Sequence, residues 1–401
     1  MIPTRAALGT AAAVLVLSGC GVAAAVTART TTVSDVIPAK DAAASLSLRS
    51  LPRPAVLPVV KATPPAYISP ANVVTILTSG SSKWLEILSH TGAVVAKTAA
   101  DPTNFWMVAA GPDGAYWTQN GAEYQLSVSG AVRKLGAVPA DAGGVVIAPD
   151  GTSYAYATSD TAQSGNVTNR IVVERQGAPA VTIADRVDDP NHPSADAPQS
   201  QSWDYYLISW TSTGIAFARV PTGGCGCGSF DMQMQSAYSA SINPVTEVVT
   251  PLTADQSCPL SAVGPGMETA CFAGDSTTTG LRVASGGVTR DNFSMSGANV
   301  AGDAVFSPAG TSLAYITIPA AQDSCGATWT ATLRVLNLAT GHAVSRTFGE
   351  LTPAVWGADG ILYGSVANAA GYATLVTVNP ATLAATELTP SAANEQFVGI
   401  M

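Results

Sequence analysis

The chain has 401 residues, of which 47% are hydrophobic and only 11% carry a charge. Charged residues make up about 25% of an ordinary soluble protein, so long surface helices, which need Lys, Glu and Arg on their wet faces, are not expected. With 37 Gly and 26 Pro, the composition indicates a strand-rich and turn-rich domain that is large enough to bury a core. The net charge of -9 and the absence of any run among the 18 basic residues argue against nucleic acid as a partner.

Residues 1–20 have the pattern of an export signal peptide, because Arg5 precedes an apolar stretch and small residues lead to Cys20. The stretch LSGC at 17–20 resembles the bacterial lipobox, in which the cysteine is lipidated and becomes the first residue of the mature protein. The resemblance implies an extracytoplasmic protein that is anchored to the cell membrane through a lipid on Cys20. The alternative is an uncleaved transmembrane anchor over 6–26, which reaches the ~20 residues of a span only by including Ser18 to Gly21.

Residues 21–66 are rich in Ala, Thr, Ser and Pro and show no sustained hydrophobic period, so we expect a flexible tether there. A domain at 67–401 follows, and within it VVIAPDGTSYAYAT at 145–158 returns as AVFSPAGTSLAYIT at 304–317. Weaker copies of this strand, turn and strand pattern have their turns about 49 residues apart on average. The turn glycines are Gly114, Gly151, Gly214, Gly266, Gly310 and Gly360.

A second strand, turn and strand phrase follows several of the first ones, as in LRVLNLATGHAVSRTF at 333–348, so each unit supplies four strands. Units of four strands that repeat at about 40 to 50 residues predict a β-propeller, an all-β ring of blades that bury their faces against each other. A pair of β-sandwiches is the alternative. Seven blades are predicted, at 67–98, 105–135, 144–186, 206–252, 264–293, 301–351 and 352–390.

The turn motif at 147–156 and 306–315 resembles that of the TolB-like and WD-repeat-like propellers of exported bacterial proteins. The first predicted blade is one strand short, since VVTIL, KWLEIL and AVVAKT supply only its second to fourth strands. EQFVGIM at 395–401 has the pattern of an inner strand that follows the seventh blade. We therefore expect the C-terminal strand to pair with the first blade and close the ring, which removes the exposed strand edges.

Catalytic motifs are missing from the sequence, which has no nucleophile elbow, metalloprotease helix or P-loop, and no cofactor is expected. An acidic segment at 185–196 contains Asp188, Asp189 and His192, but its spacing is not that of a calcium loop, so we predict a solvated loop and no metal. Trp203 and Tyr205 follow in WDYY. They could form an exposed platform for a glycan or peptide, although a strand that enters the core is favoured.

The long loops and the cysteines point to the same face of the ring. In a blade, the connection between the second and third strands and the connection to the next blade lie on one face, and the predicted long loops at 158–169, 186–204, 220–231 and 318–328 are of these two kinds. Cys225, Cys227, Cys258, Cys271 and Cys325 fall on this face too. Thiols outside the cytoplasm usually pair, so we expect Cys258 to bond to Cys225 or Cys227, and Cys271 to Cys325, with a cysteine-bound metal as the alternative.

These observations favour an exported, lipid-anchored binding or scaffold protein that recognises a protein or an envelope polymer through its long loops. The candidate contact residues are Asp188, Asp189, His192, Trp203 and Tyr205. The alternative is an extracytoplasmic glycan lyase or hydrolase with its site at the central channel, which would need two inward carboxylates about 5 to 10 Å apart. No residue is predicted to be catalytic.

Overall fold

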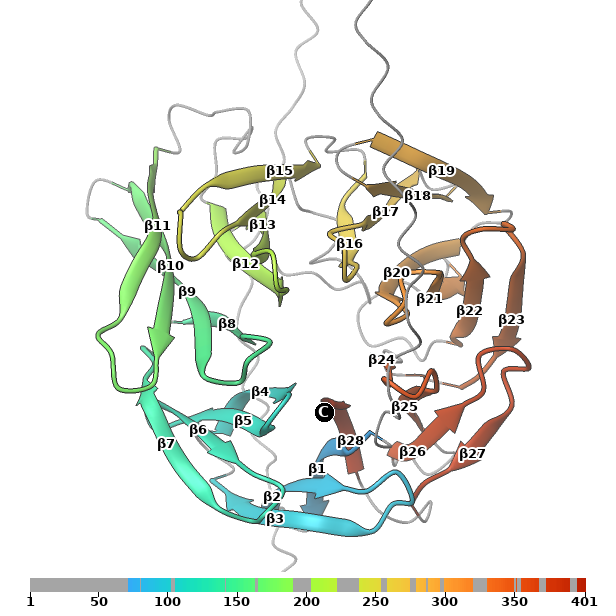
Figure 1. Ribbon diagram of the computed structural model, residues 1–401, viewed down its shortest axis with the longest axis horizontal. Coiled ribbons are helices and arrows are strands. Elements are labelled where there is room, and N and C mark those ends of the chain that lie inside the picture. The colour runs from blue at the N-terminus through green and yellow to red at the C-terminus, as the bar shows by residue number, and fades with distance from the viewer. Residues whose placement is uncertain are drawn as a thin grey trace, which may run out of the picture. The chain divides into compact units, whose positions relative to one another are not determined.

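The structure is a computed structural model of the whole chain. Its described residues are 71–401 without the following segments: 80, 102–104, 141, 163–164, 190–202, 222–237, 254–257, 275–278, 286–287, 296–298, 320–329, 350, 352–354, 368–372 and 390–394. Within this part, seven antiparallel sheets of four strands each stand around a ring (Figure 1). The predicted all-β fold is therefore confirmed. The signal peptide and the tether lie outside the described residues.

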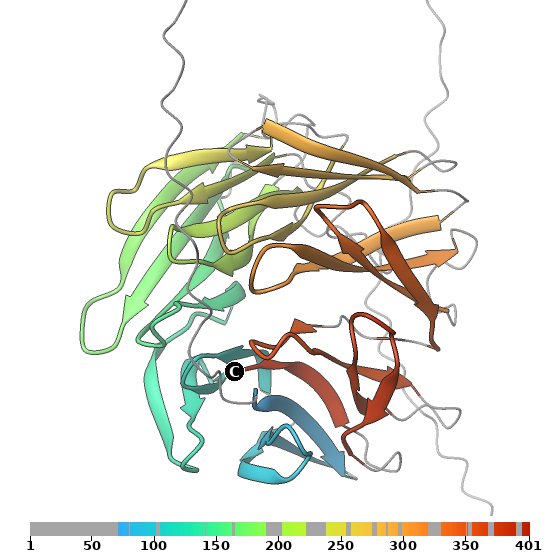
Figure 2. The same cartoon turned by 45° about the vertical axis from the view of Figure 1, so that its right-hand side comes forward.

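Each sheet is one blade, and its four strands lie side by side, with the first strand nearest the centre of the ring and the fourth at the rim (Figures 1 and 2). Blade 1 contains β28 (Glu395–Ile400), β1 (Val73–Ser79), β2 (Ser82–Leu88) and β3 (Val94–Ala100). Blade 2 contains β4 (Phe105–Gly111), β5 (Gly114–Gln119), β6 (Ala122–Leu126) and β7 (Val132–Ala137). Blade 3 contains β8 (Gly143–Ile147), β9 (Ser153–Thr161), β10 (Val167–Arg175) and β11 (Val181–Asp188).

The other four blades follow in chain order. Blade 4 contains β12 (Trp203–Trp210), β13 (Ile215–Pro221), β14 (Tyr238–Ile242) and β15 (Val249–Thr253). Blade 5 contains β16 (Leu260–Val263), β17 (Thr269–Gly274), β18 (Thr279–Ser285) and β19 (Val288–Met295). Blade 6 contains β20 (Asn299–Phe306), β21 (Ser312–Pro319), β22 (Thr332–Asn337) and β23 (Ala343–Thr347). Blade 7 contains β24 (Val355–Trp356), β25 (Leu362–Ala367), β26 (Ala373–Val378) and β27 (Ala385–Glu387).

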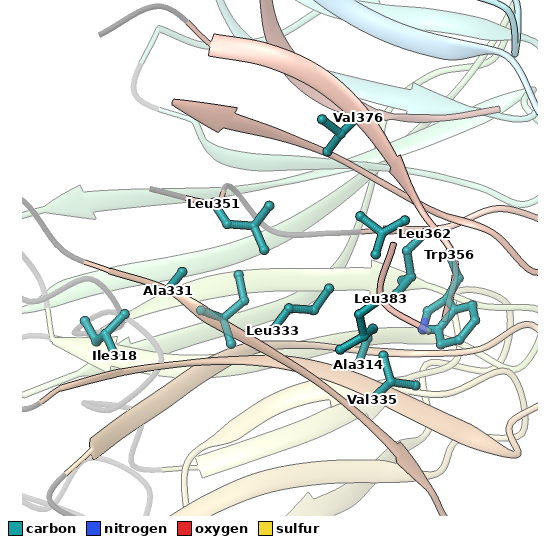
Figure 3. Close-up of a cluster of buried hydrophobic side chains, with 12 residues drawn as sticks. Ala314, Ile318, Ala331, Leu333, Val335, Leu351, Trp356, Leu362, Val376 and Leu383 are labelled. Atoms are coloured by element: carbon teal, nitrogen blue, oxygen red, sulfur yellow. The ribbon is translucent and has the colours of Figure 1, made fainter. Parts of the chain in front are cut away.

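Burial changes from strand to strand in the way that this architecture requires. The second strands β13 and β21 are buried at nearly every residue, because a neighbouring blade covers each face of the sheet. The outermost strands β7 and β27 are largely exposed and tolerate polar residues. The apolar core is therefore spread between the blades, as Figure 3 shows for the interface of blades 6 and 7, where Leu333 and Val335 face Leu362. Trp356 adds a hydrogen bond from its indole nitrogen to the Val305 carbonyl oxygen, at 3.1 Å.

The turn that repeats in the sequence has the same conformation in both of its best copies. Gly151 has φ = +67° and donates to the Ala148 carbonyl oxygen at 2.9 Å, and Gly310 has φ = +65° and donates to the Ser307 carbonyl oxygen at 2.8 Å. Glycine adopts this left-handed conformation without steric cost, which explains why the repeat keeps it. The repetition in the sequence thus reflects the repetition of one hairpin around the ring.

The C-terminal strand closes the ring as predicted. β28 pairs antiparallel with β1, with Thr75 opposite Phe397 and Leu77 opposite Glu395. The Met401 amide continues the pairing by donating to the Asn72 carbonyl oxygen at 2.9 Å. The first blade therefore receives its innermost strand from the other end of the domain, which leaves no open edge between the termini of the ring.

Candidate functional site

The antiparallel order of the strands places the two kinds of connection on opposite faces of the ring. The connections between the second and third strands, and those from blade to blade, begin and end at one face of the ring, and the long connections over 189–202, 222–237 and 320–331 are among them. We call this face the long-loop face. The opposite face carries the short hairpin turns, such as 148–152 and 211–214, and we call it the tight-turn face. The prediction of a long loop at 158–169 is wrong, because β9 and β10 cover most of this segment and leave only residues 162–166 between them.

Two of the long connections begin and end side by side. β11 ends at Asp188 before the connection 189–202, and β12 begins after it at Trp203. Trp203 is paired with Pro221, the last residue of β13, at which the connection 222–237 begins. Strand pairing therefore fixes the bases of both connections next to each other at the boundary of blades 3 and 4.

A buried cluster of polar side chains, the Arg219 cluster, lies at these bases and consists of Asn169, Asp188, Trp203, Tyr205 and Arg219. The Arg219 side chain is 1% exposed, and its Nη2 forms an ion pair with Asp188 Oδ2 and donates to the Trp203 carbonyl oxygen at 3.3 Å. Its guanidinium carbon lies 4.7 Å from the centre of the Tyr205 ring, which is a cation–π contact. The cluster joins the end of β11, the beginning of β12 and the end of β13.

Asn169 and Arg186 complete the surroundings of the Asp188 carboxylate. Asn169 Nδ2 donates to Asp188 Oδ2 at 2.8 Å and to the Trp203 carbonyl oxygen at 2.6 Å. Arg186 Nε donates to Asp188 Oδ1 at 2.8 Å from the more exposed side. Asp188 therefore lies between two guanidinium groups, and a buried charge held by several charge-assisted hydrogen bonds has one strongly preferred position.

Several polar atoms of the cluster have no hydrogen-bond partner among the described residues. They are Arg219 Nε and Nη1, Trp203 Nε1 and Asn169 Oδ1, all of them buried. An unpaired buried donor costs about 1 to 3 kcal/mol, so such atoms are uncommon in places that serve stability alone. Burial also raises the pKa of the Tyr205 hydroxyl, and the nearby Arg219 guanidinium opposes that rise.

The structure places the predicted contact residues at different depths. Trp203 is 2% exposed and Tyr205 is 9% exposed, so they enter the core and do not form an exposed aromatic platform. Asp188 is also buried, whereas Asp189 is half-exposed at the start of the connection 189–202. His192 lies outside the described residues. Asp188, Trp203 and Tyr205 therefore support the long-loop face from beneath.

Sequence reasoning missed Arg219 and Asn169. Arg219 is the single charged residue in the otherwise apolar β13, IAFARVP, and a lone arginine in a strand that is buried on both faces indicates a specific partner. Asn169 stands in the segment that was predicted to be a loop, where an asparagine carries no such signal.

One disulfide is present in the described part of the chain, and its partners differ from the predicted ones. Cys258 is bonded to Cys271, with 5.2 Å between their Cα atoms. Cys258 precedes β16 and Cys271 lies in β17, so the bond ties the connection between blades 4 and 5 to blade 5. The predicted bonds of Cys258 to Cys225 or Cys227, and of Cys271 to Cys325, are therefore wrong.

Cys225, Cys227 and Cys325, like Cys20, lie outside the described residues. Over the residues that the structure describes, no group of three or more His, Cys, Asp or Glu side chains could hold a metal ion. The same part of the chain contains no helix that is long and apolar enough to cross a membrane.

Two carboxyl groups that are buried in the fold have a raised pKa. Burial raises the pKa of Glu123 from its ordinary 4.5 to about 8, although Thr118 donates to its Oε2 at 2.7 Å. Burial is also the main cause that raises the pKa of Glu395, and the nearby Glu86 carboxylate adds to the rise. Glu123 is 0% exposed and Glu395 is 6% exposed, so neither group is placed to exchange a proton with a substrate at a surface site.

The ring of four-stranded blades defines the protein as a seven-bladed β-propeller. It is similar to TolB from Acinetobacter baumannii, with a TM-score of 0.45 and 10% identity over 82% of this chain and 67% of that one. It is also similar to an acylaminoacyl peptidase from Pyrococcus horikoshii, with a TM-score of 0.51 and 10% identity over 80% of this chain and 50% of that one. No protein-family model matches the chain, and neither does any curated protein.

The likeness to the peptidase, at 10% identity, shows a shared fold and nothing about a shared activity. The predicted β-propeller fold is confirmed by the seven four-stranded sheets themselves. This chain spans only half of the peptidase, so a comparison with that enzyme concerns its propeller architecture alone.

Proposed function

We propose that the protein is an exported, lipid-anchored propeller that binds a protein or an envelope polymer through its long-loop face at the boundary of blades 3 and 4. The observation that carries the proposal is the Arg219 cluster, which joins the bases of the connections 189–202 and 222–237. Recognition residues commonly lie on loops that a rigid scaffold positions, and a rigid base lowers the entropy that binding must overcome.

The buried polar groups support a positioning role for this cluster. An arginine and an aspartate at 1% and 5% exposure contribute less to stability than apolar residues of the same size would, because both charges lose their hydration. Such pairs are better explained where a specific geometry is required. Here the required geometry is the orientation of Asp188 and Trp203, the two residues between which the connection 189–202 lies.

The export and the anchor rest on the sequence around Cys20, and the Cys258–Cys271 disulfide supports an oxidising compartment. A Cys20→Ser variant tests the anchor. We expect the natural protein in the membrane fraction with a labelled fatty acid attached, and the variant without the label. A variant that still carries the label would contradict lipidation at Cys20.

Affinity capture from envelope extracts tests the binding surface. We propose using the full-length protein, solubilised in detergent, and a variant in which a Gly-Ser linker replaces 190–202. The matched control replaces the exposed residues 339–341 in the turn between β22 and β23, which lies on the tight-turn face. We expect the natural protein and the control to retain one partner that the 190–202 variant loses, because only that variant lacks long-loop residues. Equal capture by all three proteins would contradict the proposal.

A further inference from the structure

The tight-turn face carries an open groove between blades 3 and 4, on the side of the ring opposite the Arg219 cluster. Its volume is about 470 Å³, within the ~300 to 1,000 Å³ of small-molecule sites. Its walls come from the two first turns of these blades, 148–152 and 211–214, and from the ends of β10 and β12. The lining includes Asp150, Ser153, Arg175, Trp210, Thr211 and Pro244.

At the corresponding boundary between blades 2 and 3, a tyrosine side chain spans the gap between the blades. Tyr116 of β5 reaches the first turn of blade 3, where its hydroxyl donates to the Gly151 carbonyl oxygen at 3.1 Å. Gln125 holds it there by donating to the same hydroxyl oxygen at 2.8 Å. In the pairing of the first two strands of blade 2, Tyr116 of β5 lies opposite Ala109 of β4. The equivalent residue of blade 3 is Ala155 of β9, which lies opposite Val146 of β8. A methyl group cannot reach the first turn of blade 4, so the groove remains open there.

The chemistry of the lining favours a neutral ligand with many hydroxyl groups. Asp150 and Arg175 carry opposite charges, so an anionic ligand would face the carboxylate and a cationic one the guanidinium. Ser153 and Thr211 add hydroxyl groups that donate and accept. Trp210 adds an aromatic surface whose position is fixed by packing against the apolar core of blades 3 and 4.

The groove is also preorganised. Asp150 Oδ1 accepts the Thr152 amide at 2.9 Å, which fixes the carboxylate within the turn. Arg175 ends β10 opposite Ser153 in the strand pairing, so both residues stay on the same wall. Polar groups that are already in place need little ordering when a ligand binds, which raises the affinity that a few contacts can give.

We propose that this groove binds a short, uncharged saccharide chain. The Trp210 ring takes an apolar C–H face of one sugar, and Asp150 and Arg175 bind neighbouring hydroxyl groups of the chain, the first as acceptor and the second as donor. Pro149 and Pro244 border the groove with rigid apolar walls. The site lies on the opposite face from the proposed partner surface, so the two bind independently.

Titration of the full-length protein with uncharged tetrasaccharides tests the inference. The probes are maltotetraose, cellotetraose and chitotetraose, followed by calorimetry and by tryptophan fluorescence. We expect at least one probe to bind with a Kd of about 1 mM or lower. Arg175→Gln and Asp150→Asn should each weaken that binding roughly 10-fold, as expected for the loss of a charge-assisted hydrogen bond. Lys134→Gln, which removes an exposed charge from β7, is the matched control and should leave the affinity unchanged.

Two further variants separate contact from folding. Trp210→Ala should abolish the fluorescence change and the binding, whereas Trp210→Phe keeps an aromatic face and should retain most of the affinity. Failure of all three probes to bind at ~10 mM overturns the inference. So does binding that Arg175→Gln and Asp150→Asn leave unchanged, or a groove that binds peptide probes and no saccharide. Partner capture through the long-loop face should not respond to these variants, so failure of one proposal is distinguishable from failure of the other.

Discussion

Replacing Asp188 by Asn removes the negative charge from the Arg219 cluster and leaves its geometry nearly unchanged. In the natural protein the carboxylate is 5% exposed and binds Arg219, Arg186 and Asn169. The variant leaves the Arg219 guanidinium, at 1% exposure, without a counter-charge in the core. Breaking one partner of a buried pair costs about 3 to 5 kcal/mol of unfolding free energy, a large part of the ~5 to 15 kcal/mol of a typical domain.

Urea denaturation followed by tryptophan fluorescence measures this loss. The matched control is Asp160→Asn, since the Asp160 carboxylate also pairs with an arginine, at 2.5 Å from Arg170 Nη1, but its side chain is 63% exposed. Exposed pairs contribute about 0 to 1 kcal/mol. Adding Arg219→Met to Asp188→Asn should recover part of the loss, because the unpaired charge is gone. An Asp188 variant that is as stable as the Asp160 variant would refute the reasoning.

Three other predictions concern the ring itself. Phe397→Ala in β28 should lower the free energy of unfolding by about 3 to 5 kcal/mol, because the Phe397 side chain is buried against blades 1 and 7. Gln396→Ala, at an exposed position of the same strand, should lower it by under about 1 kcal/mol in the same urea titration. Equal losses in the two variants would disprove closure by β28. Burial raises the pKa of Glu123 to about 8 in the folded protein, so the free energy of unfolding should fall by a few kcal/mol as the pH rises from about 4.5 to 8. Glu123→Gln should remove this contribution to the pH dependence of stability, as measured by denaturation curves across the same range. Peptide mapping without reductant should find Cys258 linked to Cys271, and the loss of this bond should cost about 3 kcal/mol; a link from either cysteine to another one would contradict the structure.

The repeat pattern was sufficient to predict the propeller, because each blade needs the same glycine turn and the same apolar strands. Gly151 and Gly310 have the same conformation, and 395–401 supplies the missing strand. The prediction of a loop at 158–169 is wrong because polar side chains of this segment pair across β9 and β10, as Asp160 does with Arg170.

The site was harder to predict, since it depends on which strand ends meet across two blades. Asp188 and Trp203 were singled out, but their contacts with Arg219 depend on where the ends of β11, β12 and β13 meet, which no spacing in the sequence reveals. The cysteine pairs were misassigned for a related reason. Cys271 lies in β17 and Cys258 just ahead of β16, the strand paired with β17, so the nearest partner was the one in the same blade.

Hydrogen exchange of the full-length protein, alone and with the captured partner bound, tests the central claim most directly. The account predicts slower exchange in the peptides that cover 189–203 and 221–238, and unchanged exchange in the turns 127–131 and 243–248 of the opposite face. Protection that is confined to the tight turns, or spread evenly over both faces, would contradict a binding surface built on the long loops of blades 3 and 4.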